Sequence, residues 1–360
     1  MIAEIQIEAA AEDRARSLLA QAADLIEAKP FVAHRLLTTG NAQTIGAYLW
    51  PARFRLRDET GDEERLFAVT TDSKVLARCR WQAQRFNHPT LVMWHGIEGS
   101  ITSAYMLSTA DKAFRAGFNV LRVNFRNCGA TEHLSPTLYH GGLTDDLRAV
   151  IKELIQRDRL PQLFIAGFSL GGNKALKLAG EYGDDFPPEI KGVCAVSPSI
   201  DLRAGCDLLM RPRNWVYHQD FLYYLKRRIK LKEKLFPDLY DSNGLGAIRT
   251  IEQFDTRYIA PAFGFESVNH YYKMASALPV MDQIRIPTLI IHAVDDPFIP
   301  IDPLREPAVT TNPYILRIET ERGGHVAFIS DGGQEEDRFW AENRLIEFCR
   351  MIADREDVCE

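Results

Sequence analysis

The stretch Gly167-Phe168-Ser169-Leu170-Gly171 places a serine between two glycines where the local pattern changes. Residues 163–166 form a short apolar run of strand type, and residues 173–178 have helical spacing. A strand, a G-x-S-x-G and a helix in this order predict a nucleophile elbow, in which the serine takes strained backbone angles and the glycines avoid collisions. We therefore predict that Ser169 is a nucleophile. The bare motif also fits a glycine-rich strand-to-helix turn without catalysis.

A serine hydroxyl is a weak nucleophile, so Ser169 needs a base, and that base needs an orienting carboxylate. In an elbow site the chain order is serine, acid, histidine. Asp295 and Asp296 follow a buried apolar run, and a carboxylate just past a strand lies on the edge where α/β sites form. Two glycines precede His325 and let its loop reach Ser169. We predict His325 as the base and favour Asp296 as its partner, because the following Pro-Phe-Ile-Pro turns this carboxylate toward it. Asp295 then caps or holds the turn.

Two N–H groups must stabilise the oxyanion that forms when a serine attacks a carbonyl. The N–H of Leu170, directly after the nucleophile, is one donor by the construction of the elbow. The second is expected from the loop His95-Gly96-Ile97-Glu98-Gly99-Ser100, which follows the apolar run Leu91-Val-Met-Trp. We expect Ile97 to be this donor, with Gly96 allowing close backbone approach. His95-Gly96 alone would indicate only a glycine turn after a strand.

Composition narrows the class of protein. The chain has 360 residues, 46% of them hydrophobic and 26% charged, with a net charge of −6. Mild acidity argues against nucleic-acid binding, which needs a concentrated basic face. The six cysteines show no C-x-x-C and are expected to be reduced packing residues. The N-terminus does not resemble a signal peptide, and no apolar run reaches the ~18 residues of a membrane span. We expect a cytoplasmic protein.

The pattern along the chain predicts an α/β fold: a mostly parallel twisted sheet with helices on both faces and a helical cap insertion. We expect an N-terminal helical extension at 1–50, the α/β core, of the α/β-hydrolase type that the resemblance described below implies, at 51–199 and 285–360, and the cap at 200–284. The expected strands are at about 52–58, 65–70, 74–82, 90–95, 118–124, 162–167, 190–196, 287–293 and 313–319. The expected helices are at about 4–28, 103–116, 143–157, 171–182 and 335–352. Residues 31–50 suggest a short helix or loop.

The expected cap is rich in aromatic residues with helical spacing. Because an insertion after the strand at 190–196 lies over the edge that carries Ser169, we expect its inner face to wall an acyl pocket. The candidates for that wall are Trp215, Phe221, Tyr223, Tyr224 and Leu225. The basic run at 226–234 could meet an anionic membrane, but we favour a solvated cap helix.

The rest of the sequence does not indicate a second catalytic motif or a cofactor site. His140 and Asp145 have the H-x-x-x-x-D spacing associated with acyltransferases, but Thr144-Asp145-Asp146 is also an ordinary helix start. The histidines lack metal-ligand spacing, and no G-x-G-x-x-G follows a buried strand. We therefore expect neither a metal nor a nucleotide cofactor.

Several stretches taken together resemble the YheT-like branch of the α/β-hydrolases, whose members are esterases and acyl-handling enzymes. The matching stretches, in chain order, are His95-Gly-Ile-Glu-Gly-Ser100, Asn124-Phe-Arg-Asn-Cys-Gly129, Leu138-Tyr-His-Gly-Gly-Leu-Thr-Asp-Asp-Leu147, Gly167-Phe-Ser-Leu-Gly-Gly172, Phe254-Asp255, Ala260-Pro261, Gly264-Phe265, Tyr271-Tyr272, Ala293-Val-Asp-Asp-Pro297 and Gly323-Gly-His325. The resemblance implies Ser169, Asp296 and His325 as a catalytic triad, with Ile97 and Leu170 as oxyanion donors. The sequence departs from the family at residues 40–44, where a His-Leu pair usually stands between Gly and Gln-Thr.

These observations favour a serine esterase that cleaves short- to medium-chain acyl esters through an acyl-enzyme. Two alternatives keep the acyl-enzyme: an acyltransferase that passes the acyl group to an alcohol or thiol, and a lipid-directed lipase. A non-catalytic binding protein is disfavoured, since it has no need of a Ser-Asp-His set. The expected partner is a small acyl ester, without nucleic acid, and contact with a membrane surface is not favoured.

Overall fold

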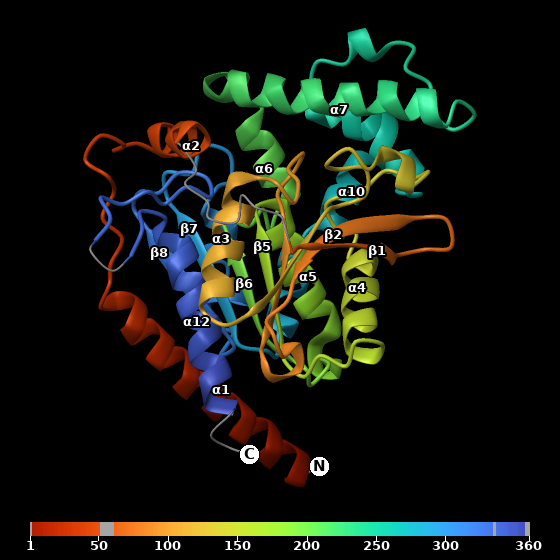
Figure 1. Cartoon of the computed structure of the whole chain (residues 1–360). Coiled ribbons are helices and arrows are strands. Elements are labelled where there is room, and N and C mark those ends of the chain that lie inside the picture. Colours follow the sequence, from red (N-terminus) through yellow and green to blue (C-terminus); the bar gives the residue numbers. More distant parts are fainter. Residues whose placement is uncertain (1, 51–60, 334–335, 357–360) are drawn as a thin grey trace.

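The computed structural model describes residues 2–50, 61–333 and 336–356, and Figure 1 shows how they are arranged. Within these ranges, eight strands form one sheet in the order β1-β2-β4-β3-β5-β6-β7-β8. The strands are β1 (Glu63–Ala68), β2 (Lys74–Arg80), β3 (Thr90–Trp94), β4 (Asn119–Val123), β5 (Leu163–Phe168), β6 (Ile190–Val196), β7 (Thr288–Ala293) and β8 (Ile315–Thr320). The two pairings of β2, with β1 and with β4, are antiparallel, and the other pairs are parallel.

Hydrophobic periodicity located these strands well, because a strand buried on both faces has a short, nearly continuous apolar run. The predicted bounds for β1 to β8 are confirmed with small shifts at the ends. The mostly parallel α/β architecture is confirmed as well. The strand predicted at 52–58 lies outside the described residues.

Helices cover both faces of the sheet, as predicted, and two separate hydrophobic cores result. One core packs α4 and α5 against the sheet, and the other packs α1, α3 and α12 against the opposite face. The helices are α1 (Ile2–Glu27), α2 (Gly40–Leu49), α3 (Ala104–Arg115), α4 (Asp145–Gln156), α5 (Leu170–Tyr182), α6 (Leu202–Leu209), α7 (Trp215–Leu235), α8 (Ile251–Phe254), α9 (Ala260–Ala262), α10 (Val268–Ala275), α11 (Pro307–Thr310) and α12 (Trp340–Glu356).

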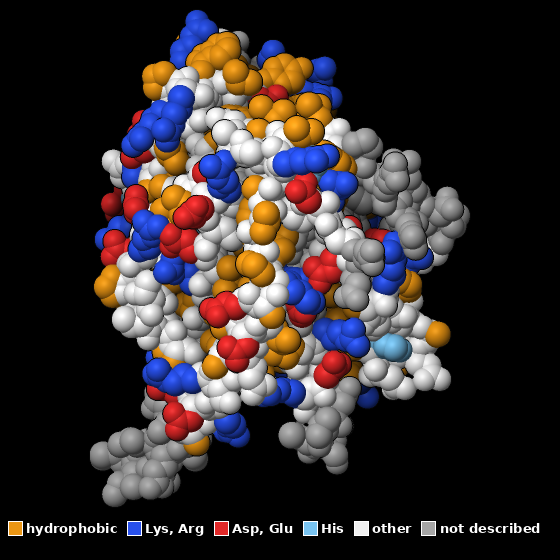
Figure 2. Space-filling view, turned by 90° about the vertical axis from the view of Figure 1, so that its left-hand side faces the viewer, with side chains coloured by type: hydrophobic (Ala, Val, Ile, Leu, Met, Phe, Trp, Pro, Cys, Tyr) orange, Lys and Arg blue, Asp and Glu red, His pale blue; other side chains and the backbone are white. Residues whose placement is uncertain are grey.

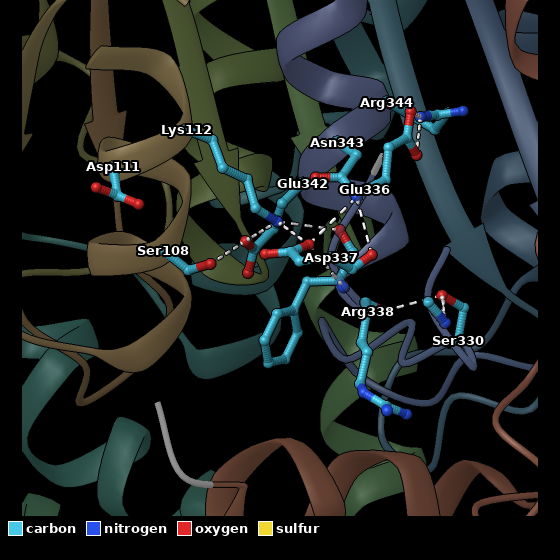
Figure 3. A network of polar contacts seen from close by, with 12 residues as sticks. Ser108, Asp111, Lys112, Ser330, Glu336, Asp337, Arg338, Glu342, Asn343 and Arg344 are labelled. Carbon is cyan, nitrogen blue, oxygen red and sulfur yellow. Dashed lines mark hydrogen bonds and ion pairs between the residues drawn. The ribbon is translucent and has the colours of Figure 1, made fainter. Parts of the chain in front are cut away.

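The prediction that the last helix begins near residue 335 is wrong, because α12 begins at Trp340. Acidic side chains before this helix bond to basic ones on other elements instead of forming a first turn. Lys112 on α3 forms ion pairs with Asp337 and with the buried Glu342, each at 2.8 Å. Figure 3 shows this network between α3 and the start of α12, with Glu336 meeting Arg344 on its other side. The network holds α12 against α3.

The segment between β6 and β7 contains α6 to α10, which lie above the sheet in Figure 1, with α7 running across the top. These helices share a third hydrophobic cluster, to which the core contributes Leu138 and Phe298. Among the described residues, none of the helices is both long enough and apolar enough for a membrane span. The five described cysteines are unpaired and buried, and Cys359 lies outside the described residues.

Candidate active site

Ser169 occupies the turn between β5 and α5 with the backbone angles φ 54° and ψ −117°. A positive φ is strained for a residue with a side chain, and it persists only where the surroundings enforce it. They do so here because neighbouring segments approach very closely. A Cβ on Gly167 would lie 2.2 Å from the carbonyl oxygen of Gly171, and a Cβ on Gly171 would lie 2.5 Å from that of Trp94. The two glycines flanking Ser169 are thus required by sterics.

His325 and Asp296 form a close pair beyond the carboxyl ends of β8 and β7. Nδ1 of His325 lies 2.7 Å from Oδ2 of Asp296, so its N–H donates to the carboxylate. Oδ1 of Asp296 accepts hydrogen bonds from the backbone N–H groups of Phe298 and Ile299. Complete burial alone would raise the pKa of Asp296, but His325 and these donors hold it below the ordinary value. Asp296 is therefore a fixed anion that orients the imidazole.

Asp295 has a different set of contacts. Its Oδ1 accepts a hydrogen bond of 2.9 Å from the backbone N–H of Gly324, the residue before His325. Burial raises the pKa of Asp295 despite this bond. Asp295 therefore holds the loop before His325 in place, whereas Asp296 contacts the imidazole ring of His325.

Phe298 connects His325 to the cavity that Ser169 lines. The ring of Phe298 lies 4.3 Å from that of His325, measured between centroids, and Phe298 also lines the cavity that contains Ser169. Ile97 and Leu170 line the same cavity. The structure thus gathers the predicted nucleophile, base, acid and oxyanion donors at the carboxyl edge of the parallel strands.

The loop that carries Ile97 is held by His95, whose side chain is fully buried. Nδ1 of His95 donates to the carbonyl of Gly96 at 2.7 Å, and Nε2 accepts from the backbone N–H of Phe125 at 3.1 Å. Burial lowers the pKa of His95 to about 3, so the ring is neutral and makes both bonds at once. A Cβ on Gly96 would lie 3.1 Å from Cβ of Ser169, so only a glycine lets the loop come this close without displacing its neighbour.

Helix α2 supports the histidine loop, a role that sequence reasoning missed. Oγ1 of Thr44 accepts a 2.9 Å hydrogen bond from the backbone N–H of His325. Gln43 is fully buried, and its side-chain amide bonds to both backbone groups of Ile329. A Cβ on Gly40 would lie 1.8 Å from the carbonyl oxygen of Asp295. The signal available in the sequence was the resemblance around residues 40–44, where Gly, Gln and Thr are retained although the His-Leu pair is absent.

The cavity beside Ser169 has a volume of about 120 Å³ and is lined mainly by aliphatic and aromatic side chains. Phe221 and Leu225 of α7 contribute to its wall, as predicted. The prediction for Trp215, Tyr223 and Tyr224 is wrong, because these side chains are exposed and do not line the cavity. Phe221 and Leu225 are one helical turn apart and share a face, whereas Tyr223 lies on the opposite side of α7. Figure 2 shows hydrophobic side chains beside Lys and Arg at the top of the molecule.

The basic run on α7 is only partly solvated, which corrects the expectation of a solvated helix. Arg228 is 8% exposed and forms an ion pair of 2.6 Å with Glu98, in the loop that carries Ile97. Lys232 is fully buried and bonds to Oδ1 of Asn127 and to the carbonyl oxygens of Glu132 and Ser135. Arg228 and Lys232 therefore connect helix α7 of the cap to loops of the core.

His140 and Asp145 are not partners in the structure. His140 lies among aromatic rings, the nearest being Phe263 at 4.5 Å between centroids, and its Nδ1 accepts from the N–H of Gly142. Burial lowers the pKa of His140 to about 3. Asp145 is the first residue of α4 and is exposed. This geometry agrees with the helix-start interpretation.

Comparisons with known proteins agree with this architecture. The family model for the alpha/beta hydrolase fold matches residues 89–332. YheT of Escherichia coli is 31% identical over 284 residues, which is 78% of this chain and 82% of that protein. Monoacylglycerol lipase of Saccharomyces cerevisiae is 30% identical over 282 residues, covering 74% of this chain and 60% of the lipase. A solved esterase of Pyrococcus furiosus superposes with a TM-score of 0.54 and 18% identity, over 82% of this chain and 95% of its own.

The family model covers more than half of the chain, and the match to YheT extends over most of both sequences. The chain belongs to the α/β-hydrolase family, in the branch that contains YheT.

Proposed function

We propose that this protein is a serine hydrolase that cleaves carboxylic esters through an acyl-enzyme formed on Ser169. The observation that supports this most strongly is the strained Ser169 in the lining of an apolar cavity, with the ring of His325, paired with Asp296, packed against Phe298 of the same lining. Strain of this kind needs a reason, and exposing a nucleophile to a base is one that this geometry provides. A protein that only binds an apolar ligand would need neither feature.

In this mechanism Oγ of Ser169 bonds to the carbonyl carbon of the ester while its proton passes to Nε2 of His325. The Nδ1–H group of His325 stays hydrogen-bonded to Asp296, which stabilises the imidazolium without taking its proton. When the tetrahedral intermediate collapses, the bond to the leaving alcohol breaks and His325 returns the proton to that alcohol. A water molecule then attacks the acyl-enzyme by the same route and releases the carboxylic acid.

The backbone N–H groups of Ile97 and Leu170 would stabilise the oxyanion. Leu170 is the first residue of α5, and the first N–H groups of a helix have no acceptor within the helix. The close approach of Gly96 to Ser169 supports this role for the loop that carries Ile97. Loss of one such donor typically costs ~10²–10³ in kcat.

The apolar cavity favours uncharged acyl chains of short to medium length. Hydrophobic walls discriminate by only ~1–3 kcal/mol per methylene, so we expect a broad chain-length profile. Peptides should react slowly, because their backbones need ordered polar partners. The relative named as a monoacylglycerol lipase makes glycerol esters a second substrate class to include.

The test is the hydrolysis of p-nitrophenyl esters of increasing acyl length by the wild type, with glycerol monoesters as a parallel series. We expect hydrolysis of soluble esters, with an optimum at short to medium length, that is insensitive to moderate salt. Added ethanol in the same assay reports acyl transfer, which would make ethyl esters at the expense of free acid. Activity confined to aggregated anionic lipids and lost with rising salt would contradict the soluble-ester proposal.

A further inference from the structure

A carboxyl group lies in the cap-side wall of the cavity. Asp255 is 8% exposed and lines the cavity among hydrocarbon and aromatic side chains. Its neighbours in that wall include Ile251, Phe254 and Ile259. A polar group in such a place is costly unless it has hydrogen-bond partners. The partners of Asp255 are therefore informative.

Tyr272 is a hydrogen-bond partner of this carboxyl group. The hydroxyl of Tyr272 donates to Oδ2 of Asp255 at 2.8 Å, and the same hydroxyl lies 3.3 Å from Sγ of Cys206. Within the described ranges, no other hydrogen bond or ion pair to the carboxyl group of Asp255 is found. A carboxyl group has two oxygens with about four acceptor positions. Oδ1 of Asp255 thus has no hydrogen-bond donor among the residues that the structure describes.

Asp255 also begins an unusual piece of backbone. Residues Asp255–Ile259 form a π-helical turn between α8 and α9. Such turns are rare and occur often at functional sites, where they aim side chains that an α-helix would direct elsewhere. Here the turn directs both Asp255 and Ile259 to the cavity. Burial among these side chains raises the pKa of Asp255 to about 7.

We propose that Asp255, held by Tyr272, binds a hydroxyl group of the substrate, so that hydroxylated esters are preferred over their unsubstituted counterparts. The proposal rests on the ester hydrolase function proposed above. A hydroxyl group can donate to the open oxygen of Asp255 and carries no charge that must be desolvated. An alkyl group would leave that oxygen unpaired, and a carboxylate would bring a second acceptor with no donor between the two.

The hydroxyl group could stand on the acyl chain or on the leaving alcohol. The first arm of the test compares p-nitrophenyl hexanoate with p-nitrophenyl ω-hydroxyhexanoate. The second arm compares propyl butyrate with glyceryl monobutyrate. The measured quantity is the ratio of kcat/KM within each pair. We expect the wild type to prefer the hydroxylated member of one pair by about tenfold, the value of one net hydrogen bond.

Variants assign the preference to Asp255. Asp255→Leu should reduce the ratio to about one, and Tyr272→Phe should lower it by loosening the carboxyl group. Asp255→Asn retains an acceptor oxygen and should keep part of the preference, which guards against misfolding of the leucine variant. Glu252→Gln is the matched control: Glu252 is on the neighbouring turn, pairs with Arg203 and is absent from the cavity wall, so the ratio should not change.

A binding measurement separates failure of this proposal from failure of the hydrolase function. The thermal shift of Ser169→Ala with each ester is recorded with and without Asp255→Leu, since it needs no turnover. We expect a larger shift from the hydroxylated ester, and the leucine substitution should remove the difference. Equal ratios and equal shifts in both arms would overturn the proposal. A stronger preference for an ester bearing a trimethylammonium group would also contradict it, because the site would then recognise a cation.

Discussion

The two neighbouring aspartates after β7 differ in what they touch. Asp296 contacts the ring of His325, and Asp295 contacts the backbone of Gly324. We expect Asp296→Asn to lower kcat by about 10⁴, because an amide favours the wrong tautomer of His325. Asp295→Asn should instead lower the unfolding free energy by about 1 kcal/mol, with a smaller effect on kcat. Kinetics and thermal melts of both variants make the comparison. A larger loss of kcat in folded Asp295→Asn would reverse the assignment.

Lys174, on α5, is the second residue-scale test. It is fully buried, its Nζ has no hydrogen-bond partner among the described residues, and it lies 3.5 Å from the ring centroid of Phe125. Burial lowers the pKa of Lys174 to about 7. An unfolded lysine titrates near ~10.4, so between these values the unfolded chain binds the extra proton. The contribution of Lys174 to stability therefore improves as pH rises from about 7 to ~10.

We expect Lys174→Met to raise the melting temperature at neutral pH, since a thioether packs against an aromatic ring without a desolvation cost. The gain over the wild type should shrink as pH rises toward ~10. Melting curves of both proteins across this pH range provide the measurement. Subtracting one curve from the other cancels the cysteines and tyrosines that titrate in both. A gain that is independent of pH would contradict the titration of Lys174.

At the scale of elements, α2 is expected to position the catalytic loop. Thr44→Val removes the oxygen that accepts from the N–H of His325 while keeping the side-chain shape. We expect kcat to fall about tenfold, in line with the loss of one hydrogen bond, with little change in KM. Thr44→Ser restores the hydroxyl group and should recover most of kcat. Equal kcat values for the valine and serine variants would show that the bond does not position His325.

The strands were predictable from the sequence because central parallel strands have a simple pattern of consecutive buried residues. The elbow was predictable because its motif is local in the sequence, although only Gly167 is required by contacts within the turn and Gly171 is required by the approach of Trp94 at the end of β3. The start of α12 was not predictable, because the acids before it form ion pairs with distant residues, Asp337 with Lys112 and Glu336 with Lys29. The faces of α7 were also missed: aromatic residues occur on both its inner and outer sides, so residue type did not show which side faces the cavity.

At the scale of the whole molecule, contacts between distant segments complete the site. Arg228 in the cap reaches Glu98 in the loop that carries Ile97, and Thr44 of α2 reaches His325 after β8. Such pairs depend on the closed fold and have no local signal in the sequence. The chain order of the predicted catalytic residues could be inferred from the sequence alone. The residues that support them could be identified only from the three-dimensional structure.

The central claim is that Ser169 is the nucleophile, and a covalent label tests it most directly. The wild type is incubated with a fluorophosphonate probe, and intact mass followed by peptide mapping locates the adduct. We expect one adduct per chain, on Ser169, with hydrolysis of a short-chain ester lost in proportion to labelling. Ser169→Ala should fold, remain unlabelled and lose about 10⁶ in kcat. An adduct on another residue, or labelling and ester hydrolysis that persist in folded Ser169→Ala, would contradict the account.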